Sequence, residues 1–508
     1  MMKEKKIKSA LISVFYKEGL EEIVRILNNL GVRIISTGGT HDFIKGIGIS
    51  SEAVEKLTSF PSVLGGRVKT LHPLIFGGIL ARRDNNEDIN QIRNFNIPEI
   101  DMVVVELYPF EETVSSLADE AEIIEKIDIG GVALIRAAAK NFNDVLVVSS
   151  RAQYSRLAEL LRKGNGYTSL EERKQFATEA FSITSGYDVA IFKYFNRERN
   201  LPAFRESFEP PFLLRYGENP HQKGIFFGKL EEVFDKLHGK EISYNNLLDI
   251  DAALALTFEF SDPAFIITKH TNACGVAERD NIFDAWKDAL ACDPVSAYGG
   301  VLACNRPIDE QAANEIDKLF FEIIISPSYE PAALEMLKHK KNRIILLQKN
   351  FNFSPNVFRS NLNGVLWQER DNITEDTSLM QPVTVRVPDK REYDDLVFAL
   401  KIVKHSKSNA IVLAMNKQLY ASGVGQTSRI DALKHAVEKA GIFGFNLNGA
   451  VLASDAFFPF ADCVEMAHKA GITAIVQPGG SIRDQDSIDF CNKHNIAMVF
   501  TGVRHFKH

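Results

Sequence analysis

Short apolar runs that alternate with helical stretches are the feature that most constrains the fold of this chain. In its first part, strand-like runs occupy residues 9–16, 32–40, 102–110 and 144–150. Helical periodicity fills the intervals, as where Ile23, Ile26, Leu27 and Leu30 fall on one helix face, and a long helical run covers 171–198. This alternation predicts a parallel β-sheet covered by helices.

A second α/β region follows. The chain has 508 residues, and 198–214 hold three of its 18 prolines without a periodic pattern, so we predict two domains, 1–197 and 198–508. Beyond the boundary, short strands are expected within 261–277, 299–309, 321–327, 409–417, 449–455, 471–480 and 496–502. An Asn-Ala step beside an apolar strand, at Asn272 and again at Asn409, is a weak hint of an internal duplication.

The composition narrows the classes of function. The 59 Lys and Arg against 66 Asp and Glu leave a net charge of -7, so no overall positive field exists to hold a nucleic acid. Five cysteines are odd in number and never spaced as Cys-x-x-Cys, which argues against a disulfide framework or a structural zinc site and favours the cytoplasm. They are Cys274, Cys292, Cys304, Cys463 and Cys491.

The N-terminal apolar stretch is brief and broken by Ser13, so it is predicted to be a strand and not a signal peptide. No uninterrupted apolar run approaches the roughly 18 residues of a membrane-spanning helix. We therefore expect no membrane partner.

Two glycine-containing turns in the first domain are candidate anion sites. Residues 36–40, STGGT, follow a strand and open a helix, where Thr40 can cap the helix and free N–H groups can face an anion. Residues 65–73, GGRVKTLHP, place Arg67, Lys69 and Thr70 close together. The alternatives are an ordinary capped turn and a solvated basic turn; Val68 before the lysine excludes a Walker A loop.

A third candidate joins Asp128 to the helix that carries Arg136 and Lys140. A carboxylate near a helix start is favoured by the helix dipole, and the two cations are four residues apart on one face. Within a cleft, Lys140 could transfer protons. The alternative is a helix cap with a surface pair.

In the second domain, Lys269 and His270 end an apolar strand, where α/β proteins present chemistry. The spacing of His270 and Cys274 hints at a metal pair, but no second pair completes it and the signature of the zinc deaminases is absent. Residues 454–460, SDAFFPF, put three aromatic rings after an acidic strand end, which suits a flat heterocycle or a core corner.

Taken in order, these segments resemble the bifunctional purine-biosynthesis enzymes that combine AICAR transformylase with IMP cyclohydrolase. The resemblance runs from about residue 8 to the C-terminus. It rests on STGGT, LGGRVKTLHP, LYPF, IDIGG, LIRAAAKN, RYGENPHQ, SYNNLLD, CGVA, DPVSAYGG, SNA, SDAFFPF and TGVRHF, which follow the family order over two domains.

The resemblance implies a fold and an activity. Residues 1–197 would form a methylglyoxal-synthase-like cyclohydrolase domain, and 198–508 a transformylase domain of duplicated cytidine-deaminase-like α/β units without a catalytic zinc. The enzyme would transfer a formyl group from 10-formyltetrahydrofolate, as co-substrate, to the 5-amino group of AICAR. Dehydrative closure of formyl-AICAR would then give IMP. A homodimer is implied, with the transformylase site at its interface.

The resemblance also implies roles for single residues. The cyclisation residues would be Lys140, Lys69, Tyr108 and Asp128, and the transformylase residues His270 as proton acceptor with Lys269 and Asn409. Nucleotide binding would fall to Ser13, Lys17, Thr37, Gly39, Thr40, Arg67 and Thr70 in the first domain and to Arg215, Tyr216, Gly299, Glu322, Arg429 and Arg504 in the second. The folate side would be formed by Phe457, Asp462 and Ser481.

Three residues depart from the family pattern. Glu106 stands where Asn usually precedes LYPF, Tyr298 stands where Phe is common, and Ala273 replaces a usual Pro. A carboxylate cannot donate a hydrogen bond as an amide does. Glu106 must therefore pair with a cation such as Lys69 or point away from the ligand.

A different class of function, a nucleotide- or folate-sensing protein without turnover, would keep the binding loops alone. The proton-handling residues Lys69, Tyr108, Asp128, Lys140, Lys269, His270 and Asn409 are all present. Their retention favours an enzyme. Loss of cyclohydrolase activity alone, through Glu106, is a further alternative.

Overall fold

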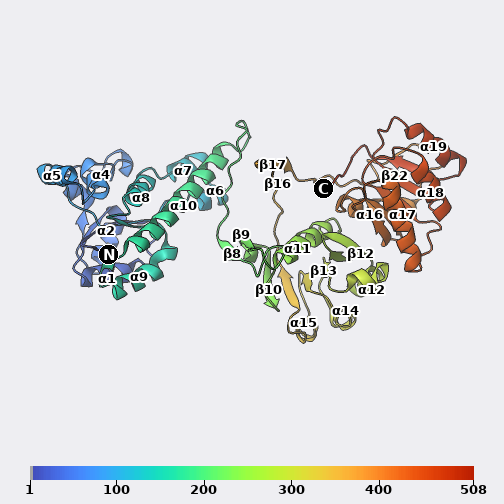
Figure 1. Cartoon of the computed structure of the whole chain (residues 1–508), viewed down its shortest axis with the longest axis horizontal. Coiled ribbons are helices and arrows are strands. Elements are labelled where there is room, and N and C mark those ends of the chain that lie inside the picture. The colour runs from blue at the N-terminus through green and yellow to red at the C-terminus, as the bar shows by residue number, and fades with distance from the viewer. Residues whose placement is uncertain (1–3) are drawn as a thin grey trace. The chain divides into compact units, whose positions relative to one another are not determined.

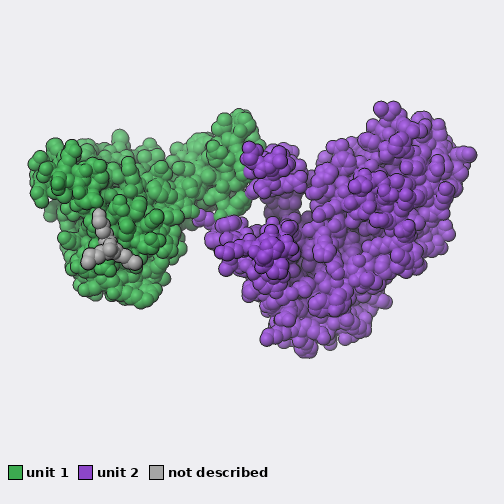
Figure 2. Space-filling view, in the orientation of Figure 1, with its two compact units in different colours: residues 1–208 green, residues 209–508 purple. Residues whose placement is uncertain are grey.

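A computed structural model describes residues 4–508. The chain divides into two compact units (Figure 2). The first ends at Phe208 and the second begins at Glu209. Each is described by itself.

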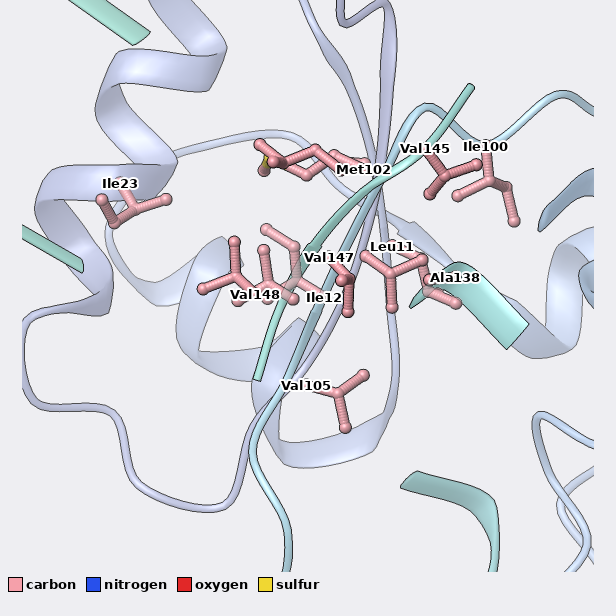
Figure 3. Close-up of a cluster of buried hydrophobic side chains, with 14 of the residues drawn as sticks. Leu11, Ile12, Ile23, Ile100, Met102, Val105, Ala138, Val145, Val147 and Val148 are labelled. Atoms are coloured by element: carbon pink, nitrogen blue, oxygen red, sulfur yellow. The ribbon is translucent and has the colours of Figure 1, made fainter. Parts of the chain in front are cut away.

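The first unit is built on a five-stranded sheet in which every pairing is parallel. Its order is β4 (Glu52–Ala53), β3 (Arg33–Ser36), β2 (Ser9–Ser13), β5 (Met102–Val105) and β6 (Leu146–Val148). Side chains of these strands, among them Leu11, Ile12 and Val147, are fully buried in one apolar cluster (Figure 3). Burial on both faces explains why these strands read as continuous apolar runs, and the predicted parallel sheet is confirmed.

Helices cover this sheet (Figure 1). They are α1 (Leu20–Asn29), α2 (Gly38–Gly46), α3 (Val54–Thr58), α4 (Pro73–Leu80), α5 (Asn86–Asn94), α6 (Phe110–Ser115), α7 (Glu120–Glu125), α8 (Gly130–Lys140), α9 (Tyr154–Lys163) and α10 (Leu170–Phe195), with the 3-10 turns η1 (Leu64–Gly66) and η2 (Arg151–Gln153) and the small pair β1 (Lys5–Lys6) and β7 (Tyr167–Thr168). Ser169 and Glu172 form a capping box that starts α10. Helix α1 ends at Asn29, so Leu30 is its C-cap.

The segment after α10 contacts the first unit. Glu206 pairs with Lys193 of α10, and the backbone N–H of Leu201 donates to Asn196 Oδ1 at 3.0 Å. The compact unit therefore extends to Phe208, past the position at which loss of periodicity suggested a boundary. Lack of periodicity marks the end of regular structure and says nothing about which neighbour a loop packs on.

The second unit contains a twelve-stranded sheet. Its order is β10 (Phe234–His238), β15 (Ile344–Gln348), β14 (Ile323–Ser326), β13 (Val301–Cys304), β11 (Ala264–Lys269), β12 (Asn272–Glu278), β20 (Gln418–Gly423), β19 (Ile411–Met415), β21 (Val451–Ser454), β22 (Ala474–Gln477), β23 (Ala497–Phe500) and β18 (Gln381–Pro382). The order and directions repeat outward from the central β12–β20 pair. The unit is therefore an internal duplication.

The helices repeat in the same way, except that the four-residue α13 of the first half has no counterpart in the second. The first half has α11 (Tyr244–Thr257), α12 (Ile282–Cys292), α13 (Pro294–Ala297), α14 (Glu310–Ile316) and α15 (Pro331–Lys338), and the second has α16 (Lys390–Lys404), α17 (Arg429–Ile442), α18 (Asp462–Ala470) and α19 (Asp484–Lys493). The remaining elements are β8 (Pro211–Leu213), β9 (Ile225–Phe227), η3 (Leu230–Glu232) and the exposed hairpin β16 (Asn356–Asn361) and β17 (Gly364–Glu369). Within residues 4–508, no helix is long and apolar enough to cross a membrane.

The Asn-Ala step is not the mark of this duplication. Asn272 begins β12, the second strand of its hairpin, whereas Asn409 precedes β19, the first strand of the other. The equivalent positions are the two hairpin turns, His270 with Thr271 and Asn416 with Lys417, where all four residues have positive φ. A two-letter match is too short to identify the register of a repeat.

Candidate functional site

A cavity of about 650 Å³ lies in the first unit at the carboxyl ends of its parallel strands. Ser13 ends β2, Thr37 follows β3 and Glu106 follows β5, and all three line it. In open parallel sheets the loops at this edge are where ligands bind. The cavity is thus in the position expected of a binding site.

The cavity gathers every residue predicted for the first domain except Lys140. The lining includes Ser13, Lys17, Thr37, Gly39, Thr40, Arg67, Lys69, Thr70, Tyr108 and Asp128. They come from five separate segments of the chain, which only the folded sheet brings together.

Hydrogen bonds join the end of β2 and the loop that follows it to the start of α2. Ser13 Oγ lies 2.8 Å from Thr37 Oγ1, and Thr40 Oγ1 donates to the Val14 carbonyl at 3.0 Å. Thr40 was predicted to cap α2, but α2 begins at Gly38 with Thr37 in the cap position. The Thr40 hydroxyl is inside the first turn and holds the neighbouring loop instead.

The three cations of the cavity have different surroundings. Arg67 forms an ion pair with Glu125, and Lys69 Nζ lies 3.6 Å from Glu55. Lys17 Nζ donates to the carbonyl oxygens of Val14 and Phe15, at 2.5 and 2.8 Å. Burial lowers the pKa of Lys17, although nearby acidic groups oppose that shift.

Asp128 and Tyr108 are the candidate proton-handling groups. Burial raises the pKa of the Asp128 carboxyl, while its hydrogen bond from the Gly131 N–H, at 2.6 Å, acts in the opposite direction. Burial, followed by the negative charge of Asp128, raises the pKa of Tyr108. A carboxyl group with a raised pKa is suited to exchange protons near neutral pH.

Lys140 lies elsewhere. It is the last residue of α8 and is exposed, whereas the α8 residues that line the cavity are Gly130, Gly131 and Leu134. Ten residues of helix separate Lys140 from Gly130 by about 15 Å along the helix axis. The predicted proton transfer by Lys140 therefore has no support from the cavity lining.

If Lys69 acts in the ring closure that the resemblance implies, replacing it by alanine should lower kcat/KM for that reaction about 100-fold or more, since a cation at the reacting group would be lost. Replacing Lys140 by alanine should leave at least about half of this activity, because the side chain does not line the cavity. Steady-state assays on supplied formyl-AICAR measure both. Equal losses would show that Lys140 acts in ring closure.

Glu106 lines the cavity and pairs with a residue that the sequence did not indicate. Its Oε1 lies 2.7 Å from Nε of Arg151, and its partner is not Lys69. Arg151 begins η2, and two residues separate it from the end of β6 (Leu146–Val148). Its place at the carboxyl end of a neighbouring parallel strand is the feature that could have identified it.

In the second unit, His270 occupies the tip of a tight hairpin. Lys269 and Asn272 are paired strand ends, and both residues between them have positive φ, 51° for His270 and 64° for Thr271. Such a type I′ turn is strained for a β-branched residue. The N–H of Thr271 donates to Asp249 Oδ1 at 2.6 Å, which helps to hold His270 in an exposed position.

A buried guanidinium organises the second cluster. Arg429 Nη2 lies 2.8 Å from both Asn409 Oδ1 and Asp455 Oδ1, and Nη1 donates to the Phe457 carbonyl at 3.0 Å. Asp455, for which the sequence allowed a heterocycle site or a core corner, is fully buried and is neutralised by Arg429. The N–H of Lys407 donates to Asn272 at 3.1 Å, which links this cluster to the His270 hairpin.

The other residues predicted for the second domain are spread over several elements. Arg215 donates to the Tyr216 hydroxyl at 2.6 Å, Glu322 pairs with Lys240, and the Arg504 guanidinium lies over the Phe506 ring. Gly299 precedes β13, Asp462 begins α18, and Ser481 follows β22. A second cavity, of about 630 Å³, is lined by none of the predicted residues.

His505 forms a buried charged group near the cluster that Arg429 organises. Its Nδ1 lies 2.6 Å from Asp371 and its Nε2 lies 2.9 Å from Glu375. Burial favours the neutral ring, but the hydrogen bonds to these two carboxylates prevail and raise the pKa of His505 to about 9. The imidazolium ties the C-terminal segment to residues 371–375.

A raised pKa makes the stabilisation by His505 dependent on pH. It should be complete below about pH 6.5, the value of an unfolded histidine, and be lost as the pH rises through about 9. The difference in urea midpoint between the wild type and His505→Gln should therefore narrow between pH 7 and pH 10. A constant difference would mean that His505 is neutral in the folded protein.

Comparison with known proteins identifies the family. A family model described as AICARFT/IMPCHase bienzyme matches residues 138–439. The bifunctional purine biosynthesis protein PurH of Bacteroides thetaiotaomicron is 60% identical over 508 residues, which is 100% of both chains. The chain belongs to the AICARFT/IMPCHase bienzyme family.

Other relatives in this bienzyme family agree. The PurH proteins of Caldicellulosiruptor saccharolyticus and Acetivibrio thermocellus are 48% and 47% identical, and each match covers 99% of this chain and 100% of the relative. A model of MGS-like domains matches residues 19–133. The predicted family, fold class and enzyme class, a formyltransferase combined with a cyclohydrolase of purine biosynthesis, are confirmed.

Potential metal ligands are not grouped together in the described part of the chain. Among residues 4–508, no group of three or more His, Cys, Asp and Glu side chains is placed to hold a metal ion. The five cysteines are free thiols buried in the second unit. His270 and Cys274 accordingly do not belong to a complete set of metal ligands in this part of the chain.

Proposed function

We propose that the first unit closes the ring of formyl-AICAR and that the second unit transfers the formyl group. The main support is the cavity at the carboxyl edge of the MGS-like sheet, which collects cations, hydroxyls, Tyr108 and Asp128. The His270 hairpin and the Asn409–Arg429 cluster support the assignment of the second unit.

In the first reaction, the 5-amino group of AICAR attacks the formyl carbon of 10-formyltetrahydrofolate. This amine is a poor nucleophile, because the ring and carboxamide withdraw its lone pair, so it must lose a proton as it attacks. His270 takes the proton, and Lys269 stabilises the charge that builds on the formyl oxygen. The bond between the formyl carbon and N10 of the folate then breaks, and tetrahydrofolate leaves with a proton on N10. The Asn409 amide bonds to Arg429 and to the Gln426 carbonyl. These two hydrogen bonds fix its orientation toward the substrates.

In the second reaction, the carboxamide nitrogen of formyl-AICAR attacks its own formyl group and water leaves. Asp128 and Tyr108 move the protons, and Lys69 stabilises negative charge at the reacting oxygen. The phosphate is held by Lys17, the hydroxyls of Ser13 and Thr37, and the N-terminus of α2. Anchoring the phosphate restricts the substrate to conformers that can close.

Folate, assembly and location complete the proposal. Phe457, Asp462 and Ser481 bind the folate, while Arg215, Tyr216, Gly299, Glu322, Arg429 and Arg504 bind the nucleotide. Because these groups are dispersed over one chain, a homodimer that brings residues of two copies together completes the transformylase site. The buried free thiols fit a protein of the cytoplasm.

The experiment supplies the full chain with AICAR and 10-formyltetrahydrofolate and follows IMP, and in parallel supplies formyl-AICAR alone. We expect IMP in both assays. Formyl-AICAR that accumulates without IMP would show that the first unit, with Glu106 in its cavity, has lost ring closure. Binding of both substrates without any product would favour a sensing protein.

A further inference from the structure

An ion pair flanks the cavity of the first unit. Glu106 lines the cavity with a side chain that is 12% exposed, whereas its partner Arg151, 40% exposed, is outside the lining. Burial raises the pKa of the Glu106 carboxyl, and the Tyr16 N–H and Arg151 oppose the rise. Ionisation of Glu106 is therefore favoured by Arg151.

Both members of this pair also contact the loop between β2 and α1. Glu106 Oε2 accepts the backbone N–H of Tyr16 at 2.8 Å, and the Arg151 guanidinium lies 4.2 Å from the centre of the Tyr16 ring. Lys17 is the next residue, and its ammonium donates hydrogen bonds to the loop carbonyls of Val14 and Phe15. The pair thus fixes the backbone that carries Lys17.

Charge gives the pair a second role. The charged side chains that line the cavity are Lys17, Arg67, Lys69, Glu106, Glu125 and Asp128, so their formal charges cancel when all are ionised. A phosphate that approaches Lys17 also approaches Glu106, whose charge acts on Lys17. Arg151 offsets the Glu106 charge from outside the cavity, and the interaction between charges is strong where solvent is partly excluded.

We infer that Glu106 and Arg151 form a positioning pair, which holds the Val14–Lys17 loop and neutralises a carboxylate that would otherwise repel the substrate phosphate. The inference rests on the proposed ring closure in this cavity. Arg151 is outside the lining, and both carboxylate oxygens of Glu106 are engaged, one by Arg151 and the other by the Tyr16 N–H. Their effect should therefore appear in substrate binding and not in the chemical step.

Three variants test the pair. Arg151→Ala should raise KM for formyl-AICAR about tenfold or more, with kcat within about threefold, because an uncompensated carboxylate then faces the phosphate. Glu106→Gln should keep KM near the wild-type value, since its amide oxygen can still accept the Tyr16 N–H. The double variant should return KM to within about threefold of Glu106→Gln. A double variant as poor as Arg151→Ala, or an unchanged KM in Arg151→Ala, would overturn the inference.

Arg156 offers a matched control. It pairs with Glu179 at 2.5 Å and lies 4.0 Å from the Phe176 ring centre, yet it does not line the cavity. Arg156→Ala should leave KM unchanged, and the affinity for IMP, measured by calorimetry, should follow KM in all variants. Wild-type protein that neither closes formyl-AICAR nor binds IMP would refute the proposed function, whereas turnover without recovery in the double variant refutes the positioning pair alone.

Discussion

Replacing His270 by alanine is expected to lower formyl transfer to AICAR about 10²- to 10⁴-fold, the usual contribution of a general base. Ring closure of supplied formyl-AICAR should stay within about twofold of the wild type, since His270 belongs to the second unit and the cavity to the first. Separate steady-state assays of the two partial reactions measure both values. A hairpin with two residues at positive φ holds His270 at its tip, so alanine removes the proposed base without removing a core side chain.

Asp128→Asn should give the reverse pattern, with ring closure lowered about 10²-fold or more and formyl transfer retained. The exposed His339 at the end of α15 provides a matched histidine control, and His339→Ala should change neither reaction. If either the His270 or the Asp128 variant loses both activities while it keeps its thermal midpoint, the division of labour between the units is wrong.

Replacing Arg429 by alanine should destabilise the second unit by about 3 to 5 kcal/mol, the cost of leaving a buried charge without its partner. The Arg429 side chain is 8% exposed and Asp455 is fully buried, and Asp455 Oδ2 already has no hydrogen-bond partner within the described protein. Alanine also removes the hydrogen bonds to Asn409 Oδ1 and to the Phe457 carbonyl. Urea unfolding followed by circular dichroism measures the loss.

Two comparisons make this prediction specific. Combining Arg429→Ala with Asp455→Asn removes the stranded charge and should restore part of the stability. Arg483 pairs with Asp486 at the surface, so Arg483→Ala should have no measurable effect. Loss of stability in Arg483→Ala equal to that in Arg429→Ala would mean that burial of the pair is irrelevant.

Several features of the candidate site could be predicted because they follow from short segments. Ser13, Thr37 and Tyr108 lie in the later halves of three strand-like runs of the first unit, and parallel strands bring their carboxyl ends to one edge. The cavity at this edge collects all three residues. The sequence also placed His270 at the end of an apolar strand, whereas the hairpin that turns there, at His270 and Thr271, appears only in the structure.

Other features could not be predicted, because helix length and strand order decide them. Lys140 shares a helix with residues that line the cavity but stands at its other end. Thr40 was expected to bond within its own helix and bonds to Val14 instead. Neither distance along a helix axis nor the partner of a hydroxyl is visible in a local pattern.

By itself, the sequence determined the α/β class, the parallel sheet of the first part and the family, since periodicity, turn residues and ordered motifs are properties of neighbouring residues. Only the tertiary structure decided the pairing of Glu106 with Arg151, of Arg429 with Asp455, and of His505 with Asp371 and Glu375. These partners lie far apart in the chain, and the order of the strands, which local pattern does not encode, determines which loops adjoin. Charge on a residue is thus readable from sequence, but what neutralises it is a property of the fold.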